Sequence, residues 1–320
     1  MSNNDRTYKI GIVGAGDMAQ EHIRAFSDIA GVDVVGIHSR TRAKAQALAH
    51  TWQVGEVFDS VEEMFHQTNP DLLVVAVSED AIFQVCKSSF VFPWTILLEK
   101  PVGLHATEAA QILSMAQNHK RDVRVALNRR YLSSTKTVLQ DLQSNAGLRY
   151  IRLQDQQHFS VAQQLGCADI VVKNWMYVNS IHVIDYLRVF GRGNITSIQP
   201  IVAWQTDVPH LVVCKVVFDS GDIGLYEAIW NGPGPWAVTI NTPQKRWEMR
   251  PLEQARYQLA GERVLHDADI HPVDTHFKPG FRLQAEDAIK VVKGEASHLP
   301  TLEDACKTMD LVKSIYCLDD

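Results

Sequence analysis

Residues 8–19 read YKIGIVGAGDMA, and this stretch decides the fold of the first part of the chain. Its first six residues form a short apolar run that is typical of a buried strand. They lead directly into Gly14, Gly16 and Ala19, which make a G-x-G-x-x-A turn, and a helix pattern follows. The stretch therefore predicts a strand, a tight glycine turn and a helix.

A turn of this kind suits a phosphate ligand. Glycine lets the backbone approach a pyrophosphate closely, and the N–H groups at the start of the helix attract its negative charge. We therefore expect Gly14, Gly16, Asp17 and Met18 to contact a dinucleotide cofactor. The alternative is a tight strand-to-helix turn in an unrelated α/β domain.

Strand and helix signals alternate over the first 127 residues, which favours the dinucleotide interpretation. Apolar strand patterns lie at residues 32–37, 71–77, 95–98 and 123–127. Helix patterns lie at residues 18–29, 41–50, 60–66 and 107–119. Because strands that are apolar on both faces belong to parallel sheets, we predict that residues 1–127 form a doubly wound α/β domain of Rossmann type.

The pattern changes in the second part of the chain. Alternating or β-rich segments lie at residues 150–159, 195–204, 210–218, 223–230, 237–240 and 246–249, and residues 218–223 are typical of a hairpin. Helix patterns lie at residues 176–190, 281–293 and 302–317. We predict that residues 128–320 form an α+β domain for substrate binding and oligomerisation, with a mostly antiparallel open sheet and helices on one face.

The composition excludes several classes of protein. The chain has 31 Lys and Arg against 37 Asp and Glu, a net charge of −6, and no basic block, so we expect a small-molecule partner rather than nucleic acid or a membrane. A polar N-terminus and the lack of an apolar stretch of about 20 residues predict a cytoplasmic protein. The five cysteines form no CxxC pair, which predicts reduced thiols and no metal site.

The end of the second predicted strand bears on the choice of cofactor. Residues 36–42 read GIHSRTR, with no carboxylate to bind an adenosine ribose and with two arginines beside hydroxyl groups. Ser39, Arg40 and Arg42 therefore favour NADP(H), whose 2′-phosphate they would bind, while NAD(H) stays possible. The alternative is that both arginines are solvated residues at the start of a helix.

A second candidate site follows the strand at residues 95–98. Residues 97–102 read LLEKPV, so Glu99 and Lys100 come where a parallel strand ends. Ligands bind at that edge of open α/β sheets, which would let Lys100 face a substrate beside the nicotinamide and exchange a proton with it. From composition alone, the alternative is a solvated surface pair.

Six short motifs in order give the chain a family resemblance. They are residues 14–19, 39–40, 99–101, 128–131, 182–185 and 300–305. This combination resembles the Gfo/Idh/MocA oxidoreductases, the family of glucose-fructose oxidoreductase and inositol dehydrogenase. The resemblance spans nearly the whole chain.

The resemblance implies roles for individual residues. Lys100, which follows Glu99, matches the family's lysine, and that lysine acts with the substrate hydroxyl and the nicotinamide. His182 matches the family's histidine, which serves as an acid/base or as a ligand of the substrate. Many members carry Asp four residues before that histidine, where this chain has Val178. Without the resemblance, His182 would be read as a core histidine on an apolar helix face.

Other residues near these motifs are candidates for substrate binding. Arg129 could bind a phosphate or carboxylate of the substrate, or form salt bridges between the domains. Trp175 and Asn179 precede the middle helix. Asp185 lies about one turn after His182, so it could contact the histidine or the substrate, or pair with Arg188. For the tryptophans, the alternative to stacking on a sugar ring is core packing.

Together, the residues and the resemblance predict an NAD(P)-dependent oxidoreductase acting on CH-OH groups. It would transfer a hydride between nicotinamide and a secondary alcohol or ketone of a sugar, inositol or nucleotide-sugar substrate held in the cleft facing the second sheet. The alternative, motivated by Val178, is a catalytically weak NADP(H)-binding regulatory protein of the same fold. The open sheet predicts a homo-oligomer, a dimer or tetramer.

Overall fold

The computed structural model describes residues 6–145, 147–208 and 210–319, and the chain divides into two compact units. The first unit comprises the residues up to Asn128 together with Thr275–Cys306, and the second comprises Arg129–Asp274 and the residues from Lys307 onward. The first boundary lies one residue beyond the expected division at 127. Residues 275–306, in contrast, return to the first unit.

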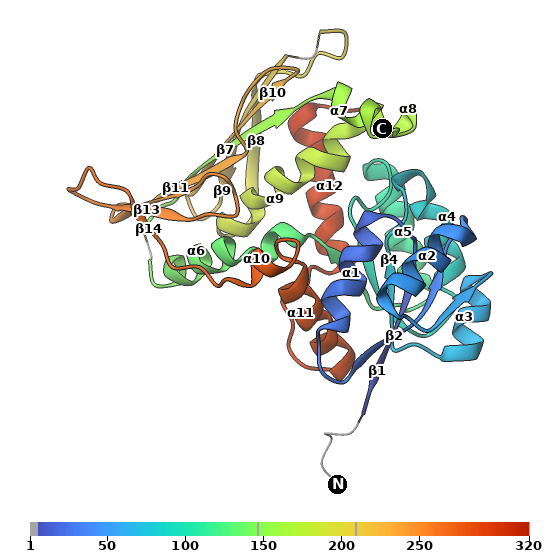
Figure 1. Ribbon diagram of the computed structural model, residues 1–320. Coiled ribbons are helices and arrows are strands. Elements are labelled where there is room, and N and C mark those ends of the chain that lie inside the picture. The colour runs from blue at the N-terminus through green and yellow to red at the C-terminus, as the bar shows by residue number, and fades with distance from the viewer. Residues whose placement is uncertain (1–5, 146, 209, 320) are drawn as a thin grey trace. The chain divides into compact units, whose positions relative to one another are not determined.

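The first unit is built on a six-stranded sheet in the order β3-β2-β1-β4-β5-β6, with every neighbouring pair parallel. Its strands are β1 (Tyr8–Val13), β2 (Val32–His38), β3 (Glu56–Phe58), β4 (Leu72–Val75), β5 (Thr95–Glu99) and β6 (Val123–Ala126). Its helices are α1 (Asp17–Ser27), α2 (Arg42–Trp52), α3 (Val61–Thr68), α4 (Ile82–Ser89), α5 (Ala106–Asn118) and α11 (Phe281–Lys293), with a 3-10 turn η2 (Glu79–Ala81). The predicted doubly wound α/β fold is confirmed, and Figure 1 shows its strands and helices.

Two elements of this unit have no counterpart in the sequence prediction. β3 has only three residues and α4 only eight, so each repeats its pattern too few times to stand out in the sequence. The strand predicted over 71–77 is also shorter, because β4 ends at Val75.

Residues 275–306 join the first unit through the packing of α11 on α1, which lie side by side in Figure 1. The ring of Phe281 lies 4.8 Å from that of His22, and Arg282 pairs with Asp28. The sequence pattern shows that α11 has an apolar face, but not which sheet or helix that face covers.

The second unit contains an eight-stranded sheet in the order β14-β13-β12-β11-β7-β10-β9-β8. The strands are β7 (Tyr150–Gln157), β8 (Ile195–Val202), β9 (Leu211–Phe218), β10 (Ile223–Trp230), β11 (Ala237–Asn241), β12 (Lys245–Met249), β13 (Arg256–Leu259) and β14 (His266–Asp267). β7 and β10 are parallel and the other neighbours antiparallel, so the predicted mostly antiparallel sheet is confirmed.

Helices accompany this sheet. They are α6 (Ser133–Gln143), α7 (Phe159–Gln164), α8 (Asp169–Lys173), the π-helix η4 (Met176–Ser180) and α9 (Ile181–Phe190), and α9 packs against β7 (Figure 1). The chain further contains η3 (Asn128–Tyr131), α10 (Val273–His276) and α12 (Leu302–Tyr316). The helix predicted over 176–190 is thus a π-helix followed by an α-helix.

Alternation along the central strands separates a buried face from a half-exposed one. In β9 and β10 every second residue is buried, and the residues between them are mostly half-buried. The half-exposed face includes Val213, Lys215, Leu225 and Glu227. Its use by a second copy of the chain stays a prediction.

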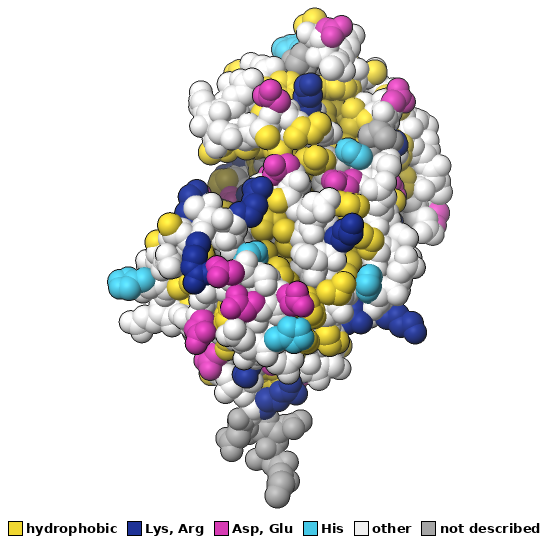
Figure 2. Space-filling model, turned by 90° about the vertical axis from the view of Figure 1, so that its right-hand side faces the viewer, with side chains coloured by type: hydrophobic (Ala, Val, Ile, Leu, Met, Phe, Trp, Pro, Cys, Tyr) yellow, Lys and Arg dark blue, Asp and Glu magenta, His cyan; other side chains and the backbone are white. Residues whose placement is uncertain are grey.

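Charge is mixed over the surface. On the face shown in Figure 2, the described Lys and Arg side chains lie interspersed with Asp and Glu and form no extended basic field. Among the described residues, no helix is both long and apolar enough to cross a membrane. All five cysteines are free thiols, and no cluster of His, Cys, Asp or Glu in the described parts of the chain could hold a metal ion.

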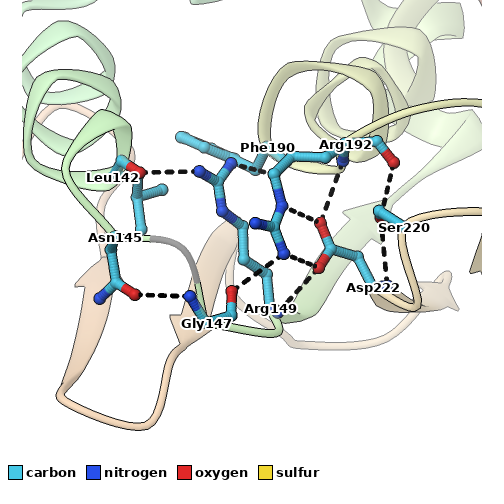
Figure 3. Close-up of polar contacts among 8 residues, drawn as sticks. All are labelled: Leu142, Asn145, Gly147, Arg149, Phe190, Arg192, Ser220 and Asp222. Atoms are coloured by element: carbon cyan, nitrogen blue, oxygen red, sulfur yellow. Dashed lines mark hydrogen bonds and ion pairs between the residues drawn. The ribbon is translucent and has the colours of Figure 1, made fainter.

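A buried ion cluster joins several elements of the second unit around the predicted hairpin, which connects β9 to β10 (Figure 3). The Asp222 carboxylate accepts hydrogen bonds from the Arg192 guanidinium at 2.6 and 2.9 Å and from the Arg149 backbone N–H at 2.9 Å. The Arg149 guanidinium donates to the carbonyl oxygens of Leu142 and Phe190, both at 2.8 Å. One carboxylate and two arginines therefore connect the ends of α6 and α9 to the sheet.

The cluster changes the acidity of its carboxyl group. Burial by itself would raise the pKa of Asp222, but hydrogen bonds from the Arg192 side chain and from the N–H groups of Arg149 and Arg192 outweigh it and lower the pKa below its ordinary value. A lowered pKa in the folded state means that the ionised group stabilises the fold above the unfolded pKa. That contribution is lost as the pH falls through the folded pKa.

Replacing the carboxylate tests this contribution. We expect Asp222→Asn to lower the free energy of unfolding at pH 7 by about 2 to 4 kcal/mol, because it leaves buried donors without their charged acceptor. Below roughly pH 4 the difference should shrink, because the unfolded wild-type chain binds a proton at Asp222 there, whereas the folded protein, with its lowered pKa, binds that proton only at lower pH. Denaturant unfolding from pH 3 to pH 7 measures both quantities. A difference between the two proteins that is constant over this range would contradict the assignment.

Candidate functional site

The turn after β1 has a backbone conformation that only glycine adopts without strain. Gly14 has φ of +122°, and a Cβ atom on it would lie 1.9 Å from the carbonyl oxygen of Ala76, just beyond β4. The Gly14 N–H donates to the carbonyl oxygen of His38 at 2.8 Å. Gly14 therefore lets the turn lie directly against the ends of the neighbouring strands.

Gly16 has a different role, since it is the N-cap of α1 and is exposed. Its φ of −96° is accessible to any residue, and a Cβ atom on it would meet no other atom within 4 Å. No described side chain caps the first turn of α1, which begins with Asp17 and Met18. Open space beside uncapped helix N–H groups fits the pyrophosphate of a dinucleotide.

The residues after β2 lie at the same edge of the sheet. Arg40 is exposed and donates to the Ser78 hydroxyl oxygen, just beyond β4, at 3.4 Å, and the Ser39 hydroxyl oxygen accepts from the Thr41 N–H. The Arg42 guanidinium instead pairs with Asp59, and both side chains are largely exposed. Both arginines were predicted to bind a 2′-phosphate. In the structure Arg42 pairs with an acidic residue of the chain, whereas Arg40 donates a hydrogen bond to a serine hydroxyl.

The end of β5 combines a fixed carboxylate with the predicted lysine. Glu99 is buried, and its Oε1 lies 2.7 Å from the Nε2 of His22 on α1. Lys100 follows directly and is half-buried. The contact between Glu99 and His22 joins the strand that carries Lys100 to the helix that begins at the glycine turn.

The second unit has a cavity of about 300 Å³ that contains several predicted residues. Its lining residues are Gln156, Gln157, His158, Val161, Trp175, Asn179 and Trp236. None of these is Asp, Glu, Lys or Arg. The structure therefore brings the predicted residues Trp175 and Asn179 together in a cavity whose walls combine amides with aromatic rings.

The residues of the middle helix have different environments. His182 is buried, and its ring centroid lies 6.3 Å from that of Trp236, which lines the cavity. Val178 is buried in the π-helix. Asp185 accepts two hydrogen bonds from Arg130, at 2.6 and 2.7 Å, and one from the Thr308 hydroxyl at 2.9 Å. The sequence left open that Asp185 contacts His182 or the substrate, or pairs with Arg188. The ion pair with Arg130 is a different contact from each of these.

Arg129 is also engaged within the second unit. Its guanidinium pairs with Glu253 at 2.9 Å and lies 5.6 Å from the ring centroid of Trp236. It does not appear among the residues that line the cavity. The salt bridge of Arg129 thus lies within the second unit and is not the bridge between domains that the sequence left open.

Several cavity residues were missed by the sequence analysis. Asp155 and Gln157 are almost completely buried and continue the inward-facing positions of Ile151 and Leu153 along β7. Polar residues at inward positions of an alternating strand are unusual, so the two-residue period contained the signal. Gln156 gave no comparable signal, whereas Trp236 is one of the tryptophans for which stacking on a sugar ring was an open interpretation.

Gly16 permits a direct test of phosphate binding at the glycine turn. We expect Gly16→Ala to change the free energy of unfolding by no more than about 1 kcal/mol, since the added methyl group enters open space. Its affinity for NADPH should fall at least tenfold, because the methyl group occupies the space needed by the pyrophosphate. Calorimetric titration and denaturant unfolding measure the two effects. Unchanged affinity would show that no phosphate lies at this turn.

Comparisons with known proteins agree with this geometry. Residues 8–127 match the family described as "Oxidoreductase family, NAD-binding Rossmann fold", which carries the name Gfo/Idh/MocA. An inositol 2-dehydrogenase of Acidothermus cellulolyticus is 26% identical over 144 residues, which are 44% of this chain and 42% of that protein. The match thus covers less than half of the length of that relative.

Solved structures resemble the chain over nearly its whole length. A levoglucosan dehydrogenase in complex with NADH and levoglucosan has a TM-score of 0.81 at 14% identity, covering 97% of this chain and 96% of that one. UDP-N-acetylglucosamine 3-dehydrogenase from Acidithiobacillus ferrooxidans has a TM-score of 0.78 at 15% identity, with 97% and 96% covered. At these identities the likeness establishes the fold. The family match itself covers residues 8–127, so this part of the chain has the NAD-binding Rossmann fold of the Gfo/Idh/MocA oxidoreductases.

Proposed function

We propose that the chain is an NADP(H)-preferring dehydrogenase that acts on a secondary alcohol, or the corresponding ketone, of an uncharged polyhydroxylated ring. The observation that carries the proposal is the carboxyl edge of the first sheet. Gly14 follows β1, Ser39 and Arg40 follow β2, and Lys100 follows β5, and all these strands are parallel. One edge therefore combines a phosphate-binding turn with an acid/base side chain.

The chemistry divides between the cofactor and the protein. Nicotinamide, when bound, accepts or donates the hydride. Lys100 is proposed to remove the hydroxyl proton during oxidation or to supply it during reduction. His182 is proposed to position a substrate hydroxyl or to relay a proton. Glu99 is proposed to fix the strand end through His22, and Lys100 would also contact the cofactor.

The cavity of the second unit supports an uncharged substrate. Its amide groups can hydrogen-bond to hydroxyls, and Trp175 and Trp236 offer apolar faces to the C–H bonds of a ring. A phosphate or carboxylate would require a basic partner, and Arg129 already pairs with Glu253. The names of similar proteins indicate action on inositol, levoglucosan or UDP-N-acetylglucosamine. The first two compounds are uncharged rings, and the third, which carries a diphosphate, tests the restriction to uncharged substrates.

A substrate panel tests the proposed reaction. Myo-inositol, levoglucosan, glucose, glucose 6-phosphate and UDP-N-acetylglucosamine would be supplied with NADP⁺ or NAD⁺, and the absorbance of the reduced cofactor followed. We expect oxidation of at least one uncharged ring and a lower kcat/KM for the phosphorylated compounds. Oxidation restricted to the phosphorylated compounds would overturn the substrate class.

Lys100 provides the catalytic test. We expect Lys100→Ala to lower kcat by about 100- to 10,000-fold, the range attributable to a general acid or base. NADPH affinity should change by less than threefold, because the glycine turn is untouched. Lys87→Ala, which removes an exposed lysine on α4, serves as the control and should behave as the wild type. Turnover by Lys100→Ala within tenfold of the wild type would refute the assignment.

Arg40 provides the test of cofactor choice. A charge-assisted hydrogen bond to a 2′-phosphate contributes ~1.5 to 3 kcal/mol, which corresponds to about tenfold or more in affinity. We therefore expect Arg40→Ala to weaken NADPH binding at least tenfold and NADH binding by less than threefold. Arg42→Ala should have the smaller effect, since Arg42 pairs with Asp59. If Arg40→Ala weakened the binding of NADPH and NADH by the same factor, Arg40 would not bind a 2′-phosphate and NAD(H) would become the expected cofactor.

A second candidate function rests on Val178. Its buried aliphatic side chain occupies the position, four residues before His182, where many relatives have an aspartate, and it cannot exchange a proton. The chain would then be a regulatory protein that binds NADP(H) and turns over slowly. NADPH binding without turnover of any compound in the panel would favour this alternative.

A further inference from the structure

We propose that Asp155 and Gln157 are positioning residues that fix the side chain of Asn179 so that it offers a hydrogen-bond acceptor to a substrate hydroxyl in the cavity. The proposal deepens the function proposed above and rests on it. None of the residue roles suggested by the sequence includes Asp155 or Gln157. The argument depends on the direction of each hydrogen bond within the second unit.

Gln157 lies between a carboxylate and two donors. Its Nε2 donates to Oδ1 of Asp155 at 2.6 Å, and its Oε1 accepts from Nε1 of Trp175 at 3.1 Å and from Nδ2 of Asn179 at 2.8 Å. An indole N–H can only donate, so the oxygen of Gln157 must face Trp175. Its amino group must then face Asp155, and the orientation of the amide is fixed from both sides.

The other side of Asp155 is fixed in the same way. The Tyr226 hydroxyl donates to Oδ2 of Asp155 at 2.7 Å and lies 2.9 Å from the Tyr316 hydroxyl, whose oxygen accepts from Nε1 of Trp230 at 3.2 Å. The single hydroxyl proton of Tyr226 is used on Asp155, so between the two tyrosines the Tyr316 hydroxyl is the donor. Donors therefore converge on Asp155 from two directions.

Because these residues are buried, a polar group left without a hydrogen-bond partner would cost free energy of folding. Asp155 and Gln157 expose 2% and 1% of their surface, and Tyr226 and Trp230 are completely buried. Burial raises the pKa of Asp155, while hydrogen bonds from Tyr226, Ser180, Gln157 and Trp236 oppose that rise. Even when protonated, Asp155 could place the proton on Oδ2 toward Tyr226, so Oδ1 remains an acceptor for Gln157.

The consequence for the cavity concerns Asn179. Its amino group is committed to Gln157, and the half-buried side chain lines the cavity. This bond uses one of the two amino N–H groups and sets the direction of the amide, which fixes the place of the carbonyl Oδ1, a group that accepts but does not donate. The cavity would therefore select a ligand whose hydroxyl donates at this point, which suits a polyol.

Variants along one strand test the arrangement by kinetics. Gln157→Leu should raise KM for the best substrate of the panel about three- to tenfold with kcat changed less than twofold, because Asn179 loses its fixed orientation. Asp155→Asn retains an acceptor for Gln157 and should stay within twofold of the wild-type KM. Gln154→Leu, on the opposite face of β7, is the matched control. A wild-type KM in folded Gln157→Leu would overturn the proposal, as would a KM for Asp155→Asn equal to that of Gln157→Leu.

A spectroscopic readout separates this inference from the proposed reaction. The chain has seven tryptophans, so its indole N–H signals in a ¹H–¹⁵N spectrum are few, and Trp175→Phe identifies the one of interest. We expect Asp155→Leu to shift the Trp175 signal through Gln157, whereas Asp155→Asn and Gln154→Leu leave it in place. If no compound in the panel is oxidised, the proposed function fails. The Trp175 indole signal then tests the positioning role of Asp155 and Gln157 without any substrate. An unmoved signal in folded Asp155→Leu overturns it.

Discussion

At the centre of the first sheet, the backbone of the turn after β1 lies directly against the backbone that follows β4. This contact constrains the glycine turn and the helix that follows it. β1 lies between β2 and β4, and the turn after β1 contacts the chain beyond both neighbours. The Gly14 N–H donates to His38, and the Ala76 N–H donates to Val13. A side chain at position 14 would occupy the place of the Ala76 carbonyl oxygen. Gly16, two residues further on, borders open space, and α1 begins directly after it.

The contact between Glu99 and His22 extends this constraint to a second strand. His22 lies on the buried face of α1 a few residues beyond the glycine turn, and Glu99 ends β5. Phe281 packs on the His22 ring, so a helix far along the sequence supports the same contact. This contact therefore links the end of the strand that precedes Lys100 to the helix start that is proposed to bind the cofactor.

The sequence predicted the first unit well because its signals are local. The apolar run before Gly14 and the helix after it are adjacent in the chain, and each depends only on its own period. The environments of Asp185, Arg129 and α11 could not be obtained in this way. Asp185 pairs with Arg130, 55 residues earlier, and Phe281 meets His22 across more than 250 residues. Nothing in the local pattern distinguishes a carboxylate that binds a ligand from one that pairs with a distant arginine.

The polar residues of β7 show a case in which the local pattern did contain the information. Asp155 and Gln157 occupy inward positions that Ile151 and Leu153 establish. Burying a carboxylate and an amide is unfavourable unless donors and acceptors are matched, and here the indoles of Trp175 and Trp230 provide donors at both ends. An apolar strand would achieve the same packing without that requirement. The polar residues therefore add no evident stability, and the feature they do provide is a defined direction for the amide that faces the cavity.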